Sequence, residues 1–133
     1  MKIYQNHQAG LGFKELHVRS RIKQGVLSAI PLEELAKYFP EKETFETVNY
    51  LKSKETVVEA FAFKLSPIVF YGHLQNGSAT TLGLHYISNP SDISARLIES
   101  IAQLMKVKNL LLVDWVHLAL VDTESLEKYF YQA

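Results

Sequence analysis

The segment 66–88, SPIVFYGHLQNGSATTLGLHYIS, limits the fold of this chain more than any other stretch. Asn76 and Gly77 stand at its centre, and both residue types tolerate the positive φ angles that a tight type I′ turn requires. Strand-forming residues flank the turn on both sides, which predicts a β-hairpin. The predicted pairs are Gln75 with Ser78, Leu74 with Ala79, His73 with Thr80, and Tyr71 with Leu82.

Three helices are predicted, and the longest covers about residues 90–106. Asn89 can cap it, Pro90 suits its first position, and an apolar stripe recurs at helical spacing along the segment. A short helix is expected near 31–39, since Pro31 suits a first turn and the proline after residue 39 stops a helix. Another is expected near 123–131, for which Asp122 is a ready cap.

The remaining strands are predicted from alternation and from apolar runs. Residues 13–23 alternate between apolar and polar, 44–51 and 56–65 suggest a second hairpin, and 110–121 is the most apolar run. A chain of 133 residues is the usual size of one domain, so we expect 1–133 to form a single domain. The predicted fold is α+β, with five or six mostly antiparallel strands packed by the long helix.

Asp114 and His117 flank the only tryptophan and raise the question of a catalytic pair. In one continuous strand, side chains alternate, so Asp114 and His117 point to opposite faces. An acid and an imidazole that act together must lie within hydrogen-bond reach. We therefore predict no catalytic pair here and no catalytic residue elsewhere, because no nucleophile motif is present in the sequence.

A pocket is one alternative site. The predicted hairpin and the long helix would leave space between them, floored by Tyr71, His73 and Tyr86. In the predicted register, His73 and His85 lie on opposite faces of the hairpin and do not converge. Histidines and carboxylates do not occur at a metal-binding spacing such as His-Glu-x-x-His, so we expect neither a metal nor another cofactor.

A basic stripe follows one side of the predicted strand 13–23. Its four members span about 20 Å, enough to meet a row of phosphates or carboxylates. Outward basic residues also protect edge strands from pairing with other chains, so the stripe is either a binding surface or a solvated edge. The stripe comprises His17, Arg19, Arg21 and Lys23.

Acidic residues gather further along the chain, between residues 33 and 46. They could pair with the basic stripe inside the fold, or they could orient a protein partner. The candidates for partner binding in this segment are Glu33, Glu34, Glu41 and Glu43.

Composition narrows the class of protein. Fourteen basic and fourteen acidic residues balance, whereas a protein that wraps nucleic acid is normally basic, so nucleic acid is not the expected partner. The run 110–121 is too short to span a bilayer, and the first residues lack the apolar core of an export signal. We expect a cytoplasmic protein that does not enter membranes.

The end of the chain resembles a known class. NLLLVDWVHLALVD at 109–122 and SLEKYF at 125–130, after a long amphipathic helix, resemble the ends of small bacterial immunity proteins, including some paired with contact-dependent-inhibition toxins. The resemblance implies an α+β protein without catalytic activity that docks on a toxin domain. Many such proteins are acidic because their toxins are basic nucleases, whereas this chain has no net charge. No functional residue is carried over.

The sequence therefore predicts a small non-catalytic protein-binding domain, and an immunity protein that neutralises a toxin domain is the specific form suggested by the resemblance. A small-molecule-binding domain or enzyme with the pocket described above is the alternative. A further alternative is a nucleic-acid-binding module that uses the basic strand within 14–23. An exposed edge strand would also allow a homodimer by sheet extension.

Overall fold

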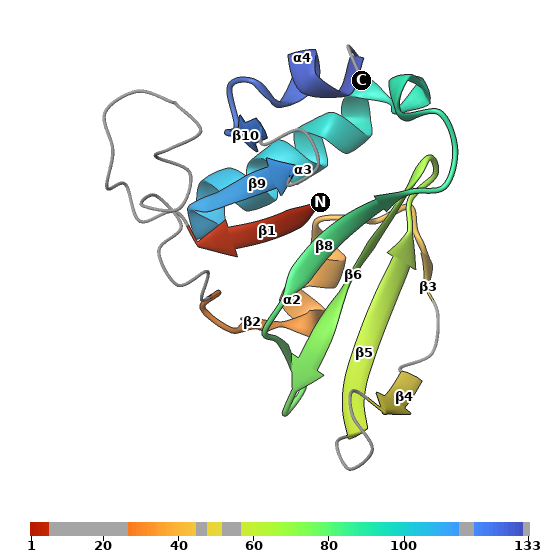
Figure 1. Cartoon of the computed structure of the whole chain (residues 1–133), viewed down its shortest axis with the longest axis vertical. Helices are drawn as coiled ribbons and strands as arrows, with labels where there is room; N and C mark the ends of the chain where they lie inside the picture. Colours follow the sequence, from red (N-terminus) through yellow and green to blue (C-terminus); the bar gives the residue numbers. More distant parts are fainter. Residues whose placement is uncertain (6–26, 45–47, 52–56, 115–118, 132–133) are drawn as a thin grey trace.

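The computed structural model describes residues 1–5, 27–44, 48–51, 57–114 and 119–131 (Figure 1). The strands are β1 Lys2–Gln5, β2 Ile30–Pro31, β3 Glu43–Thr44, β4 Val48–Leu51, β5 Val57–Lys64, β6 Ile68–Gln75, β7 Ser78–Ala79, β8 Leu82–Tyr86, β9 Leu110–Asp114 and β10 Ala119–Val121. The helices are α2 Leu32–Lys37, the 3-10 helix η1 Pro90–Asp92, α3 Ala95–Lys108 and α4 Leu126–Tyr131. The predicted strand at 13–23 lies outside the described residues.

The described strands form one antiparallel sheet of ten strands, and the predicted α+β class is confirmed. The main order is β10-β9-β1-β8-β6-β5-β3, with β4 also on β5 and β7 joining β2 to β6. The N-terminal strand β1 lies in the middle, between β8 and β9 (Figure 1). Sequence segments from the start, middle and end of the chain are therefore neighbours in the sheet.

The prediction of five or six strands was too low, for two physical reasons. The run 110–121 is not one strand, because β9 and β10 pair antiparallel with Ala119 opposite Asp114 and the chain reverses between them. Several other strands, such as β2 and β7, have only two residues, which is too short for alternation to be detected. The second predicted hairpin is present, since β3 and β4 both pair with β5.

The helices are found where the sequence placed them, but their ends differ. The long helix begins at Ala95 rather than at 90, because Ser94 caps it by accepting the Leu97 N–H at 3.1 Å. Asn89 instead caps η1, accepting the Ser91 N–H. The short helices α2 and α4 confirm the other two predictions. Within the described residues, no helix combines the length and apolar character needed to cross a bilayer.

The helices cover one face of the sheet, here called the helix face, and Figure 1 shows α2 and α3 on the same side of the strands. Apolar side chains of the helices and of alternate strand residues fill this layer. Phe70 of β6 is completely buried there, and its ring centroid lies 5.1 Å from that of Phe39. The opposite side of the sheet, here called the outer face, carries the alternate residues, such as Tyr71.

The central hairpin follows the predicted register only near its turn. Gln75 pairs with Ser78 and Leu74 with Ala79, and both Asn76 and Gly77 have positive φ, at 53° and 78°. Further from the turn the register shifts by one residue, so Tyr71 pairs with Gly83 and not with Leu82. The shift is a β-bulge, in which the β8 side of the hairpin has one extra residue.

Glycine at position 72 makes room for the bulge. A Cβ atom on Gly72 would lie 1.9 Å from the carbonyl oxygen of Thr81, so no larger residue fits there without a backbone shift. Because the bulge resets the alternation, His85 pairs with Val69 and lies on the outer face with His73. The prediction that the two histidines lie on opposite faces was therefore wrong.

Candidate functional site on the outer face of the sheet

The residues of the basic stripe, His17, Arg19, Arg21 and Lys23, lie outside the described residues, as does His117. The choice between a binding surface and a solvated edge for the stripe therefore stays a prediction, as does the nucleic-acid alternative that depends on it.

The acidic candidates do not form an uncompensated acidic surface. Each of three acids has a basic partner from another element: Glu34 with Lys108, Glu41 with Arg96 at 3.0 Å, and Glu43 with Lys64 at 3.9 Å. Coulomb attraction between such exposed charges is weak, but the pairing cancels much of the field that a partner would meet. These pairs join residues 21 to 74 positions apart, so no local pattern in the sequence could reveal them.

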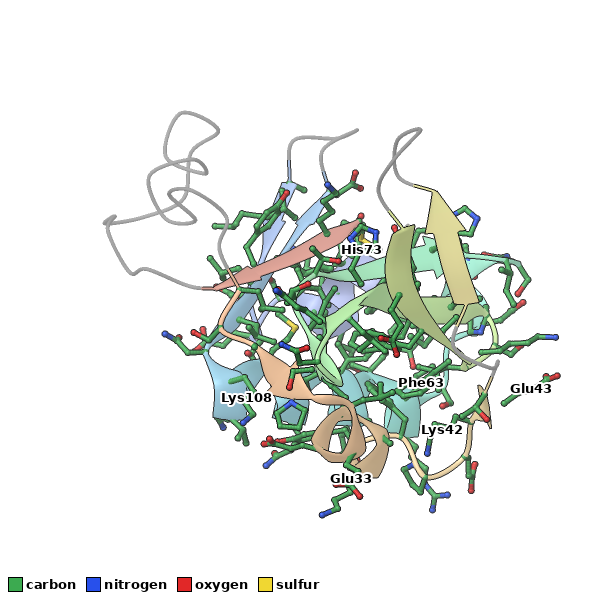
Figure 2. All side chains as sticks on the ribbon, turned by 90° about the horizontal axis from the view of Figure 1, so that it is seen from below. Glu33, Lys42, Glu43, Phe63, His73 and Lys108 are labelled. Atoms are coloured by element: carbon green, nitrogen blue, oxygen red, sulfur yellow. The ribbon has the colours of Figure 1, made fainter. Side chains whose placement is uncertain are left out.

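Glu33, the fourth acidic candidate, is exposed on α2 beside a shallow groove of about 390 Å³. Phe61 and Phe63 form part of its apolar lining. Lys42 lies at its rim, where its Nζ donates to the Phe39 carbonyl oxygen at 2.9 Å, and the ammonium lies 5.6 Å from the Phe63 ring centroid. Figure 2 shows Glu33, Lys42 and Phe63 around this end of the molecule. Lys42 thus caps carbonyl groups at the C-terminal end of α2, and its ammonium group already has hydrogen-bond partners within the chain.

The predicted pocket between the sheet and the long helix is wrong as a single site. Tyr71 and His73 lie on the outer face, whereas Tyr86 lies on the helix face and meets Phe130 of α4 edge to face, with ring centroids 6.3 Å apart. Fully buried side chains such as Ile101 and Leu104 pack between the sheet and α3. A hollow of about 170 Å³ lies at one edge of this layer, beside Leu65 and Arg96, but none of the three predicted residues lines it. Strand alternation explains the separation, because the bulge and the pairing place the three residues on two faces.

Tyr71 and His73 instead help to line a hollow of about 300 Å³ on the outer face, here called the outer hollow. β1 supplies Lys2 and Tyr4, and β6 supplies Tyr71 and His73. The bulged segment and a buried residue before β2 complete the lining with Thr80, Thr81, Leu82 and Leu27, together with Ile3 of β1. Lys2 brings a positive charge to this lining, and none of the described lining residues is an aspartate or a glutamate.

The bulge shapes the polar wall of the outer hollow. The His73 N–H donates to Thr81 Oγ1 at 3.0 Å, and the Thr80 N–H donates to the His73 carbonyl oxygen at 3.0 Å. The Thr81 side chain, which is held in this way, can bind a ligand with little loss of conformational entropy. Figure 2 shows His73 close to β1 and well away from Lys42 and Phe63.

Tyr71 is the exposed aromatic residue of the outer hollow, with 40% of its surface accessible. Its ring lies against Gly83 on the neighbouring strand, where an added Cβ would stand 2.6 Å from Tyr71 Cζ. An aromatic ring placed over a glycine on the next strand is covered on one side and open on the other. Such a ring offers a rigid apolar contact together with a hydroxyl, which is what aromatic anchors at interfaces provide.

The sequence named Tyr71 and His73 as pocket residues but placed them against the long helix, and it missed the other residues of the outer hollow. Lys2 and Tyr4 reach it only because β1 pairs with β8, with Lys2 opposite Gly83. Such a pairing over about 80 residues leaves no local signal. The bulge did have a signal, because a glycine inside each strand of the hairpin, at positions 72 and 83, indicates a bulge or a close backbone approach.

Asp114 forms a second polar cluster, on the helix face. Its side chain is 6% exposed and accepts a hydrogen bond from the Tyr129 hydroxyl of α4. Burial raises the pKa of Tyr129 well above its ordinary value, and the hydrogen bond to Asp114 raises it further. Burial also raises the pKa of Tyr86 nearby. The geometry is that of a buried acid satisfied by a phenol, which anchors α4 to the end of β9.

Replacing Tyr129 with phenylalanine is expected to lower the free energy of unfolding by about 2 kcal/mol at neutral pH, because buried Asp114 loses a donor. The wild type should also lose stability as pH rises above about 10, since tyrosine in the unfolded chain then ionises while folded Tyr129 keeps its proton. The variant should show a weaker alkaline loss. Urea unfolding between pH 7 and pH 11 measures both effects.

Tyr71→Phe is the matched control for that experiment, because it removes the same hydroxyl from an exposed ring. A Tyr129→Phe variant as stable as this control at pH 7, with an unchanged alkaline slope, would show that the hydrogen bond to Asp114 contributes nothing.

Among the described residues, no three histidine, aspartate or glutamate side chains are grouped so that they could hold a metal ion. The outer hollow, by contrast, brings together cationic, hydroxyl and aromatic groups from strands that are distant in sequence. In comparisons with known proteins, no family model, no curated protein and no solved structure matches this chain.

Proposed function

We propose that this chain is a small binding protein without chemistry of its own, which recognises another protein through the outer hollow. The observation that carries the proposal is the convergence of exposed Tyr71 with Lys2 and Thr81 on the sheet face opposite the helices. A rigid aromatic ring surrounded by polar groups is typical of the centre of a protein interface. The internal ion pairs of Glu34, Glu41 and Glu43 favour this face over the acidic segment.

The resemblance of residues 109–122 and 125–130 to immunity proteins supports a narrower form of the proposal. In this form the partner is a toxin domain, and the complex forms in the cytoplasm. Binding would then neutralise the toxin by covering its surface, and no catalytic group would be needed.

A small-molecule-binding domain is the second candidate. The volume of the outer hollow, about 300 Å³, lies at the lower end of the range of ligand pockets. A protein that binds no partner protein but binds a compact metabolite at Tyr71 would support this candidate instead.

Replacing Tyr71 with alanine is expected to weaken partner binding about 30-fold, which corresponds to the loss of one aromatic hot spot of about 2 kcal/mol. The measurement is a quantitative pull-down from cells that produce the protein, followed by titration of the recovered partner. Because Tyr71 is exposed, the variant should fold normally.

Tyr131→Ala is the matched control, since Tyr131 is exposed to a similar degree, at 43%, but lies on α4. A stoichiometric partner retained by the wild type and by Tyr131→Ala, and lost by Tyr71→Ala, supports the proposal. Recovery of no stoichiometric partner, or equal recovery by all three proteins, contradicts it.

A further inference from the structure

We infer that the segment of the partner that enters the outer hollow is acidic, with an aspartate or glutamate side chain held between Lys2 and Thr81. This inference rests on the proposed function and specifies the chemistry of the partner at the same site.

The charge of the outer hollow comes from Lys2, which is exposed, and His73 is the other basic side chain of the lining. No described lining residue is acidic, so the described part of the lining attracts an incoming carboxylate. A lysine side chain from a partner would instead be repelled by Lys2. Charge complementarity of this kind selects partners and speeds their association.

The hydroxyl groups of the wall also favour an acceptor. Thr81 Oγ1 already accepts the His73 N–H, so its own hydrogen can be donated to a ligand. Lys2 has three donors and no acceptor capacity. Hydrogen bonds from such groups to a carboxylate are charge-assisted and stronger than those to a neutral amide. Tyr71 adds an exposed ring beside them, against which the aliphatic part of a glutamate can pack.

Three of the acids that the structure describes lie away from the outer hollow. Glu34 and Glu41 are paired with bases of α3, and Asp114 is buried on the helix face. An acidic segment on the outer face therefore avoids these carboxylates. The size of the outer hollow, about 300 Å³, suits two or three side chains of an extended segment rather than a whole helix.

The test is an NMR titration of the isotope-labelled full chain with a blocked octapeptide of glutamate, compared with the same peptide of glutamine. The glutamate peptide should shift the amide signals of residues 2–4, 71–73 and 80–82, and its affinity should fall as salt is raised. The glutamine peptide should bind at least about tenfold more weakly. Equal binding of the two peptides, or shifts that lie elsewhere, would overturn the inference.

Lys2→Glu should lower the affinity for the glutamate peptide about tenfold or more. Lys106→Glu is the matched control, because it makes the same charge change at an exposed position of α3, far in sequence from the outer hollow. An equal loss in both variants would mean that only net charge matters and would overturn the inference. A single-stranded thymidine octanucleotide is the third probe, and binding at the same residues as tight as that of the peptide would also overturn it, in favour of phosphate recognition.

The two proposals fail in different ways. If a partner protein is lost with Tyr71→Ala but unaffected by Lys2→Glu and by salt, the acidic segment is wrong and the proposed function stands. If no partner protein is recovered while the glutamate peptide still binds at Lys2, the proposed function is wrong, and the outer hollow is a site for acidic chains with another role.

Discussion

Replacing Phe70 with alanine is expected to lower the free energy of unfolding by about 4 kcal/mol. Phe70 has no accessible surface, and its ring packs among those of Phe39, Phe61 and Phe63, with centroids 5.1 to 6.3 Å away. Removal of the ring loses its transfer free energy, and it also leaves a cavity that rigid neighbouring rings cannot fill. Since small domains are stable by only about 5–15 kcal/mol, this is a large part of the total.

Urea unfolding followed by circular dichroism measures this loss. Tyr71→Ala is the control, because it removes a comparable ring from the adjacent position of β6 on the other face, where 40% of the residue is exposed. That variant should lose about 1 kcal/mol or less. If the two variants were equally stable, the assignment of the two faces of the sheet would be wrong.

Replacing Gly72 with alanine is expected to lower the free energy of unfolding by about 3 kcal/mol. The added Cβ would lie 1.9 Å from the Thr81 carbonyl oxygen, which is backbone and cannot rotate away. The bulge must therefore open, and the hydrogen bond from the His73 N–H to Thr81 Oγ1 is lost with it. Because that bond shapes the outer hollow, the same variant should also lose binding of the glutamate peptide at concentrations where it remains folded.

Gly83→Ala separates backbone crowding from the mere addition of a methyl group. Its Cβ would approach Tyr71 Cζ at 2.6 Å, but Cζ is the far end of a side chain that can move. This variant should lose about 1 kcal/mol and should alter ligand binding through the displaced ring. A Gly72→Ala variant that is no less stable than Gly83→Ala would argue against the bulge.

The candidate site could be predicted only in part. The turn at Asn76-Gly77 was identified from its residue types, whereas Tyr71 was expected against the long helix and lies on the other face of β6. The partners of Tyr71 were not identified, because Lys2 reaches the site through β1, which has only four residues and no distinctive pattern. The ion pairs of three acidic candidates also leave no local signal, since their bases come from α3 and β5.

The apolar run at 110–121 shows the limit of periodicity. Its composition is correct for a buried strand, and β9 is buried throughout. The prediction that Asp114 and His117 point to opposite faces required one continuous strand. Because β9 pairs antiparallel with β10, the run is not continuous and the prediction loses its basis. Alternation predicts the face of a residue only where the chain does not turn or bulge.

The sequence by itself determined the elements that short-range forces decide. These are the turn at Asn76-Gly77, which needs two positive φ angles, and the three α-helices, which depend on spacing and caps within a few residues. Only the tertiary structure decided that β1 lies between β8 and β9, that the hairpin bulges at Gly72, and that the outer hollow exists. The position of β1 and the outer hollow come from the burial of apolar area and the pairing of backbone groups between segments about 80 to 110 residues apart, and such pairings are chosen by competition over the whole chain. The bulge lies within one hairpin, but its exact place depends on how closely Gly72 packs against Thr81, which the sequence indicated only through the glycines of the two strands.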